Sequence, residues 1–167
     1  MRRITVLLII GLLLCGCAAD PAAENAVFID PNAVQGGGYG DLYFEADGVR
    51  FGIYDEAAPV LDALPAFRTM FTAETCAFDS HDVYYYYAGF QIMVNEIDGV
   101  ERITAITVAD DTVRTPQGLY IGMREEDAYK AVPALAGQDR ILIDGTAQMA
   151  VVIKDGVIAG IVYTPSV

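Results

Sequence analysis

The sequence predicts an α+β fold in which two degenerate tandem repeats, each a helix plus an antiparallel meander, form one domain. This domain follows a signal peptide and a flexible tether. Four Asp-Gly pairs separate segments rich in β-branched and aromatic residues, and such pairs favour the tight turns of β-hairpins. Two short segments instead show the apolar spacing of a helix. Similar sequence surrounds both of them in the same order, which indicates the repeat.

The first 16 residues are predicted to be a signal peptide. Two arginines precede an apolar run from Ile4 to Leu14, which is shorter than the roughly 20 residues that a membrane-spanning helix needs. The run ends in a segment that resembles a bacterial lipobox, Leu14-Cys15-Gly16-Cys17. This resemblance implies cleavage before Cys17, which then carries a diacylglyceryl group and further acylation such as palmitate. Two or more acyl chains are enough for stable membrane attachment.

Residues 17–40 are predicted to be the lipidated N-terminus and a flexible tether, because they are rich in Ala, Asp, Asn, Pro and Gly. The full chain has a formal net charge of −13, and loss of the signal peptide removes two further basic residues. Such a charge argues against binding to nucleic acid or to anionic lipid headgroups. We therefore expect the lipid on Cys17 alone to hold the chain at the extracytoplasmic face of the cell membrane.

Residues 41–167 are predicted to form the single α+β domain, with a first repeat at about 41–108. Its helix spans Glu56 to Leu64, with Asp55 as the N-cap and Pro59 in the first turn, where proline is tolerated. Its strands are Leu42 to Ala46, Val49 to Ile53, Val83 to Tyr87, Phe90 to Asn95 and Arg102 to Val108.

The second repeat spans about 119–165. Its helix is predicted at Arg124 to Val132, with acidic residues near its N-terminus. Its three strands are Arg140 to Ile143, Ala147 to Ile153 and Val157 to Tyr163. Aligning the two repeats places Phe51-Gly52-Ile53-Tyr54-Asp55-Glu56 against Ile121-Gly122-Met123-Arg124-Glu125-Glu126.

The segment from Thr115 to Asp127 resembles the helix-initiating motif of small envelope lipoproteins. That group includes the outer-membrane assembly small lipoproteins and the tandem-repeat β-lactamase-inhibitor proteins. The chain is also similar to uncharacterised clostridial lipoproteins, at Ala57 to Leu61 and Cys76 to Phe78. The resemblance implies the fold type and the habit of binding proteins. This chain lacks the tryptophans and disulfides of the inhibitor proteins, so inhibition itself is not carried over.

No catalytic, metal-binding or cofactor-binding residues are predicted. Ser80, His81 and Asp82 are adjacent in the chain, and adjacent side chains cannot reach one another in triad geometry. Cys76 with His81 leaves open an envelope enzyme, although acidic and apolar neighbours raise a thiol pKa. The segment Asn95 to Glu101 is rich in possible calcium ligands but lacks EF-hand spacing.

Four consecutive tyrosines, Tyr84 to Tyr87, are the most unusual local feature. Because side chains alternate along a strand, one pair is expected in the core and the other at the surface. We take Tyr85 and Tyr87 as the candidate binding face, since exposed tyrosines are typical of recognition surfaces. The sequence thus predicts a non-enzymatic module that binds an envelope or extracellular protein. The alternatives are a lipoprotein that binds carbohydrate or a small ligand, and an envelope enzyme that uses Cys76.

Overall fold

The computed structural model describes residues 42–74, 81–137 and 140–166. They form a small mixed α+β domain that is mostly β-sheet. Its helices are α1 (Ala57–Ala63), α2 (Glu125–Ala131) and the short 3-10 helix η2 (Pro133–Ala136). Its strands are β1 (Phe44–Ala46), β2 (Val49–Phe51), β3 (Thr69–Glu74), β4 (His81–Tyr86), β5 (Phe90–Ile97), β6 (Val100–Val108), β7 (Ile141–Asp144), β8 (Ala147–Lys154) and β9 (Val157–Pro165).

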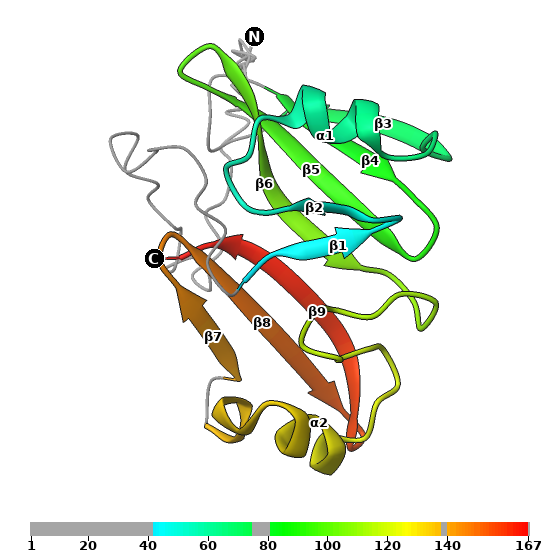
Figure 1. The fold of residues 1–167 in the computed structure, drawn as a ribbon, viewed down its shortest axis with the longest axis vertical. Coiled ribbons are helices and arrows are strands. Elements are labelled where there is room, and N and C mark those ends of the chain that lie inside the picture. Colours follow the sequence, from blue (N-terminus) through cyan, green and yellow to red (C-terminus); the bar gives the residue numbers. More distant parts are fainter. Residues whose placement is uncertain (1–41, 75–80, 138–139, 167) are drawn as a thin grey trace, which may run out of the picture.

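Seven strands form one antiparallel sheet in the order β3-β4-β5-β6-β9-β8-β7 (Figure 1). Strands β6 and β9, which are far apart in the sequence, join its two halves. Thr107 lies opposite Val162 at the centre of this junction. The strands on either side of α2 in the sequence therefore share one sheet and one core.

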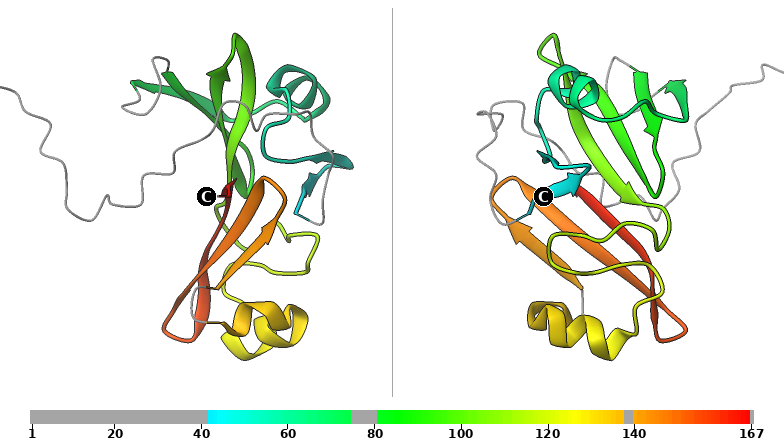
Figure 2. Two further views of the ribbon diagram at one scale, coloured as in Figure 1. Left: turned by 90° about the vertical axis from the view of Figure 1, so that its left-hand side faces the viewer. Right: turned by 45° about the vertical axis from the view of Figure 1, so that its right-hand side comes forward.

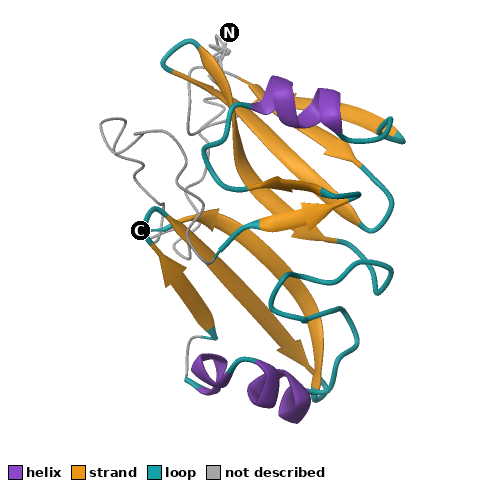
Figure 3. Ribbon diagram, in the orientation of Figure 1, coloured by secondary structure: helices purple, strands orange, loops and turns teal. Residues whose placement is uncertain are grey.

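Both α-helices and the two-stranded β1–β2 hairpin lie on the same side of the seven-stranded sheet (Figures 2 and 3). We call this side the helix side and the opposite side the open face. On the helix side, the ring of Phe44 packs against the rings of Phe51, Phe90 and Tyr163, at centroid distances of 5.6, 5.2 and 6.0 Å. All four side chains are at most 3% exposed. Their burial attaches the β1–β2 hairpin to both halves of the sheet.

Each α-helix begins directly after a single bridge to a strand of the sheet. Glu56 pairs with Arg102 before α1, and Arg124 pairs with Val157 before α2. The prediction of Asp55 as the N-cap of α1 is wrong. The N-cap is Glu56, whose side chain makes no capping hydrogen bond. The Asp55 carboxylate instead accepts a backbone N–H three residues earlier, at 2.7 Å. We conclude that the bridge to β6, and not a capping side chain, determines where α1 begins.

Three of the four predicted Asp-Gly turns have both residues at positive φ, as type I′ hairpin turns require. At the tip of the β5–β6 hairpin, for example, φ is 53° for Asp98 and 76° for Gly99. At Asp144-Gly145 only the glycine has positive φ, because Asp144 is still the last residue of β7. The hairpin predictions are confirmed at Asp47, Asp98 and Asp155, and the turn predicted at Asp144-Gly145 begins one residue later.

The strand β3 was not predicted from the sequence. It pairs with β4 along its whole length and forms one edge of the sheet. Five of its six residues are exposed. A strand without a buried face has no alternation of apolar and polar residues, and that alternation is the signal by which strands are recognised in a sequence.

Within the ranges that the structure describes, no helix is long and apolar enough to cross a membrane. The predicted signal peptide, the lipidation site Cys17 and the tether up to residue 40 lie outside the described residues.

Candidate functional site

The open face extends across all seven strands, and no described helix or hairpin lies over it (Figure 2). Three rows of cross-strand neighbours on this face contain no charged residue, in a chain whose net charge is −13. Depletion of charge is typical of the centre of a protein interface. One row crosses the whole sheet and two cover its halves: Thr69-Tyr86-Gln91-Thr107-Val162-Ala150-Ile141, Phe71-Tyr84-Met93-Ala105 and Thr164-Gln148-Ile143.

Most of the exposed large hydrophobic side chains of the described residues lie on the open face. There are six such side chains in all, and four belong to this face: Phe71, Ile141, Ile143 and Val152, with exposed fractions of 57%, 38%, 67% and 54%. Two of them stand near one edge, on β7, and Phe71 stands at the other, on β3. Exposed apolar side chains gathered on one face are typical of interaction sites in soluble domains.

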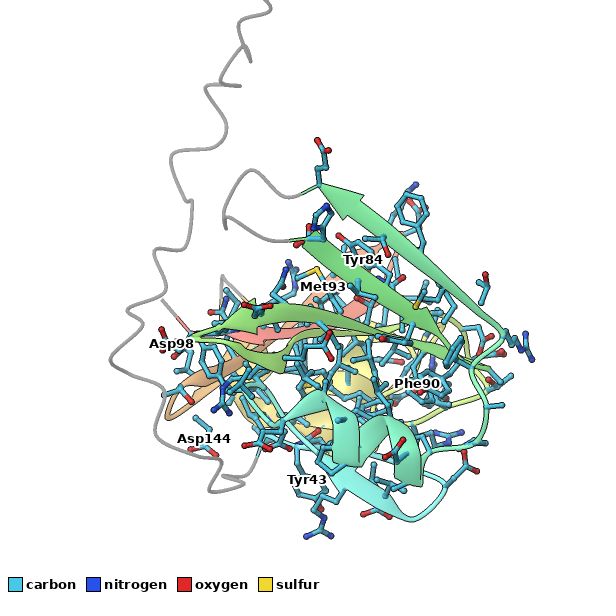
Figure 4. The ribbon with its side chains drawn as sticks, turned by 90° about the horizontal axis from the view of Figure 1, so that it is seen from above. Tyr43, Tyr84, Phe90, Met93, Asp98 and Asp144 are labelled. Carbon is cyan, nitrogen blue, oxygen red and sulfur yellow. The ribbon has the colours of Figure 1, made fainter. Side chains whose placement is uncertain are left out.

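An aromatic cluster occupies the β3–β5 corner of the open face. The rings of Phe71 and Tyr84 lie 6.3 Å apart, and Met93 is the cross-strand neighbour of Tyr84. Figure 4 shows Tyr84 and Met93 on one side of the sheet and Phe90 on the other, toward α1. Burial and the neighbouring Asp82 carboxylate both raise the pKa of Tyr84. Its hydroxyl therefore stays protonated at neutral pH and is a hydrogen-bond donor at the edge of an apolar surface.

A buried polar network ties together β4, β5 and β6 beside this cluster. Asn95 and Thr104 are only 1% and 2% exposed. The Thr104 hydroxyl donates a hydrogen bond to the Asn95 side-chain carbonyl, and the Asn95 amide donates to Asp82. Asp82 in turn accepts a hydrogen bond of 3.4 Å from the Tyr84 hydroxyl. The network thus holds the carboxylate that orients Tyr84.

The predicted binding residues, Tyr85 and Tyr87, lie on the helix side and not on the open face. Tyr87 is only 6% exposed, and Tyr85 is half-buried against the core. The reason is the pairing of β4 with β5, because Tyr85 stands opposite Ile92, which is fully buried. One tyrosine pair does face the core, as expected, but the outward pair is Tyr84 and Tyr86.

The sequence contained a signal for this assignment. A two-residue turn at Ala88-Gly89 places Tyr87 opposite Phe90, and the Tyr87 N–H donates to the Phe90 carbonyl at 2.9 Å. Counting back from the turn pairs Tyr84 with Met93. The apolar alternation of β5 identifies the buried face of both strands. The hydrophobic residues of β3 and β7 on the open face had no such signal, since both are edge strands.

The other residues considered from the sequence do not form a described reactive site. His81 is exposed at the start of β4, where it lines a shallow helix-side cleft of about 480 Å³ with Glu96 and Glu101. Cys76 and Ser80 lie outside the described residues, so the predicted Cys76–His81 pair has no described geometry. Asn95 is buried in the network above. Among the residues that the structure describes, no three His, Cys, Asp or Glu side chains are grouped as metal ligands.

Comparisons of the chain with protein-family models, with curated proteins and with solved structures found no match.

Proposed function

We propose that the chain is a lipid-anchored extracytoplasmic lipoprotein that binds a protein partner through the open face and catalyses no reaction. One observation carries the proposal: four of the six exposed large hydrophobic side chains in the described ranges lie on one sheet face, and three of them stand in the rows without charge. Burying that apolar area against a partner is favourable, and no charged side chain in those rows must be desolvated. The tyrosines add large contact areas with a polar end.

The membrane anchor is the lipid on Cys17. The apolar run and the Leu14-Cys15-Gly16-Cys17 segment support this part of the proposal. Metabolic labelling with a palmitate analogue tests it. We expect Cys17→Ala to lose the label, whereas the matched Cys15→Ala keeps it, because only the cysteine after the cleavage point receives the lipid. Label that persists in Cys17→Ala would contradict the anchor.

We further propose that the domain consists of two equivalent units, about 41–108 and 119–165, in the manner of the tandem-repeat inhibitor proteins. In each unit a bridge precedes a seven-residue helix, and a hairpin with an Asp-Gly turn and a register shift follows. Thr107 and Val162 lie at equivalent places in β6 and β9 and face each other. The bridges make Glu56 equivalent to Arg124, whereas the sequence alignment pairs Glu56 with Glu126.

Photocrosslinking in living cells tests the open face as the binding surface. A photoreactive amino acid replaces Tyr86 on β4, one strand in from the β3 edge, or Val162 on β9, next to the central strand. The matched control replaces Tyr120, which lies in the loop before α2. We expect a discrete protein adduct from the first two positions and none from Tyr120. Adding Thr107→Lys should abolish the adduct, because it places a charge at the centre of the uncharged rows.

Two results would contradict this proposal. An adduct of equal yield from Tyr120 would place the contact elsewhere on the domain. An adduct at Tyr86 and Val162 that contains sugar and no protein would replace the protein partner with a carbohydrate.

A further inference from the structure

Strand β3 is an edge strand that no other described segment pairs with on its outer side. It lies at the end of the seven-stranded sheet, with β4 on one side and no described strand on the other (Figure 1). Its pairing with β4 contains no register shift, and residues 69–74 include no proline or lysine. Met70 on the helix side and Phe71 on the open face are 50% and 57% exposed. Natural proteins usually block such edges with lysine, proline or bulges, so a free apolar edge favours addition of a further strand.

The opposite edge of the sheet is less suited to pairing. Strand β7 has four residues, whereas β3 has six. Arg140, which precedes β7, has a φ of 50° and turns the chain away from an extended path. Its guanidinium is also 3.0 Å from both the Glu125 carboxylate and the Tyr129 hydroxyl. The charge at that end of β7 is therefore already paired within the chain.

The charges of β3 make it complementary to itself. Arg68 precedes the strand and Glu74 ends it, and both are exposed. Neither forms an ion pair within the described ranges. In an antiparallel pair of two β3 strands centred on Phe71, Arg68 of each copy stands opposite Glu74 of the other. The long Arg68 side chain, in the bend that precedes β3, reaches the Glu74 carboxylate of the other copy, so this pairing forms two ion pairs.

We infer that two copies of this chain associate through antiparallel pairing of their β3 strands about Phe71. The pairing is isologous, so it closes as a dimer and does not continue as a fibre. It also joins the two open faces edge to edge and places the two Phe71 rings side by side. The inference is independent of the partner proposed above, because it uses the backbone edge of β3 and places only Phe71 of the exposed open-face side chains at the dimer contact.

A cysteine at the two-fold centre tests this dimer in cells that make the full chain. Phe71→Cys is introduced with Cys76→Ser, so that all variants keep only the cysteines of the signal and anchor. Directly opposite Cα atoms in an antiparallel pair lie about 4.5–5.5 Å apart, within disulfide range. We expect a disulfide-linked dimer on a non-reducing gel. The matched control is Ile143→Cys on β7, where the side chain is at least as exposed as Phe71, and it should give no dimer.

Charge reversal tests the register. In the Phe71→Cys background, Arg68→Glu or Glu74→Arg replaces two attractive contacts with two repulsive ones, which should lower the crosslinked fraction about tenfold. The double variant restores opposite charges and should recover the dimer. Lys154→Glu, far along β8, controls for net charge and should have no effect.

Four outcomes would overturn the inference. Phe71→Cys could crosslink no more than Ile143→Cys, or it could link to a different protein. Co-expressed Phe71→Cys and Ile143→Cys chains could link to each other, which would mean head-to-tail association. Finally, the double charge reversal could fail to recover the dimer lost in the single variants.

Discussion

Two buried tyrosines differ in whether their hydroxyl groups are paired. The Tyr163 hydroxyl donates to the Gln117 side chain at 3.2 Å, whereas the Tyr87 hydroxyl is buried without a partner in the described structure. We predict that Tyr87→Phe raises the free energy of unfolding by about 1 kcal/mol, because it removes an unpaired buried polar group. The stack of ring 87 on Phe90, at 4.7 Å, stays in place. Tyr163→Phe should instead lower the free energy of unfolding by about 1 kcal/mol, because it removes a hydrogen bond.

Urea denaturation of both variants and of the wild type measures these differences. Equal destabilisation by the two substitutions would show that the Tyr87 hydroxyl is paired in solution, and the prediction would be wrong.

Glycine at position 89 is required for two separate reasons. It has a φ of +83°, and a Cβ there would lie 2.5 Å from the Thr112 hydroxyl and 2.8 Å from a Val113 methyl group. Gly99 has a similar φ of +76° but open space around it. We predict that Gly89→Ala costs about 3 kcal/mol of stability and Gly99→Ala about 1, because only the first adds a clash to the backbone strain. Similar losses in thermal unfolding would contradict this reading of the β4–β5 turn.

At the scale of elements, α2 contributes stability that depends on pH. The Tyr129 hydroxyl and the Arg140 guanidinium donate hydrogen bonds to Glu125 and lower its pKa from 4.5. Because the pKa of Glu125 is lower in the folded state, its carboxylate is protonated at a higher pH in the unfolded chain than in the folded one. The contribution is therefore complete above about pH 4.5 and is lost as pH falls through the folded-state pKa.

We predict that Glu125→Gln lowers stability at pH 7 and that its difference from the wild type shrinks as the pH falls below 4.5 and through the lowered folded-state pKa of Glu125. Asp62→Asn, on the exposed side of α1, serves as the control and should change stability little at either pH. Acid also protonates the other carboxylates and so reduces charge repulsion within this acidic chain. Comparing each variant with the wild type at the same pH removes this shared effect. A difference for Glu125→Gln that is independent of pH would contradict the prediction.

The elements that sequence reasoning found are those whose signals are local. Positive φ occurs at Asp47, Asp98 and Asp155, each followed by glycine. The Asp-Gly pair alone indicates such a turn, so two residues of sequence are enough to predict it. Strand β3 was missed because its pairing partner, and not its own composition, makes it a strand. The wrong tyrosine pair was predicted to face outward, because the buried face of β4 depends on its pairing register with β5. Strands β6 and β9 also pair over a long distance in the sequence, and no local pattern predicts that pairing.

At the scale of the molecule, the two faces of the sheet differ, because one is packed against the helices and the β1–β2 hairpin and the other is exposed. The helix side buries the aromatic residues that hold both halves together, including Phe44 and Tyr163. The open face leaves four large apolar side chains exposed, which adds nothing to the stability of an isolated domain. Such a surface is consistent with a partner that covers it. The proposed binding function requires that a partner lies over the open face in cells.

Cysteine accessibility measures this cover most directly. Ala150→Cys places a thiol on the open face and Ala63→Cys places one at the end of α1, each with Cys76→Ser. A membrane-impermeant maleimide is applied to cells with their outer surface accessible and, separately, to the purified full chain. We predict that the thiol at residue 150 is labelled far more slowly in cells than after purification, whereas the thiol at residue 63 reacts equally in both. Equal labelling of residue 150 in cells and in solution would mean that nothing covers the open face, and would contradict the account.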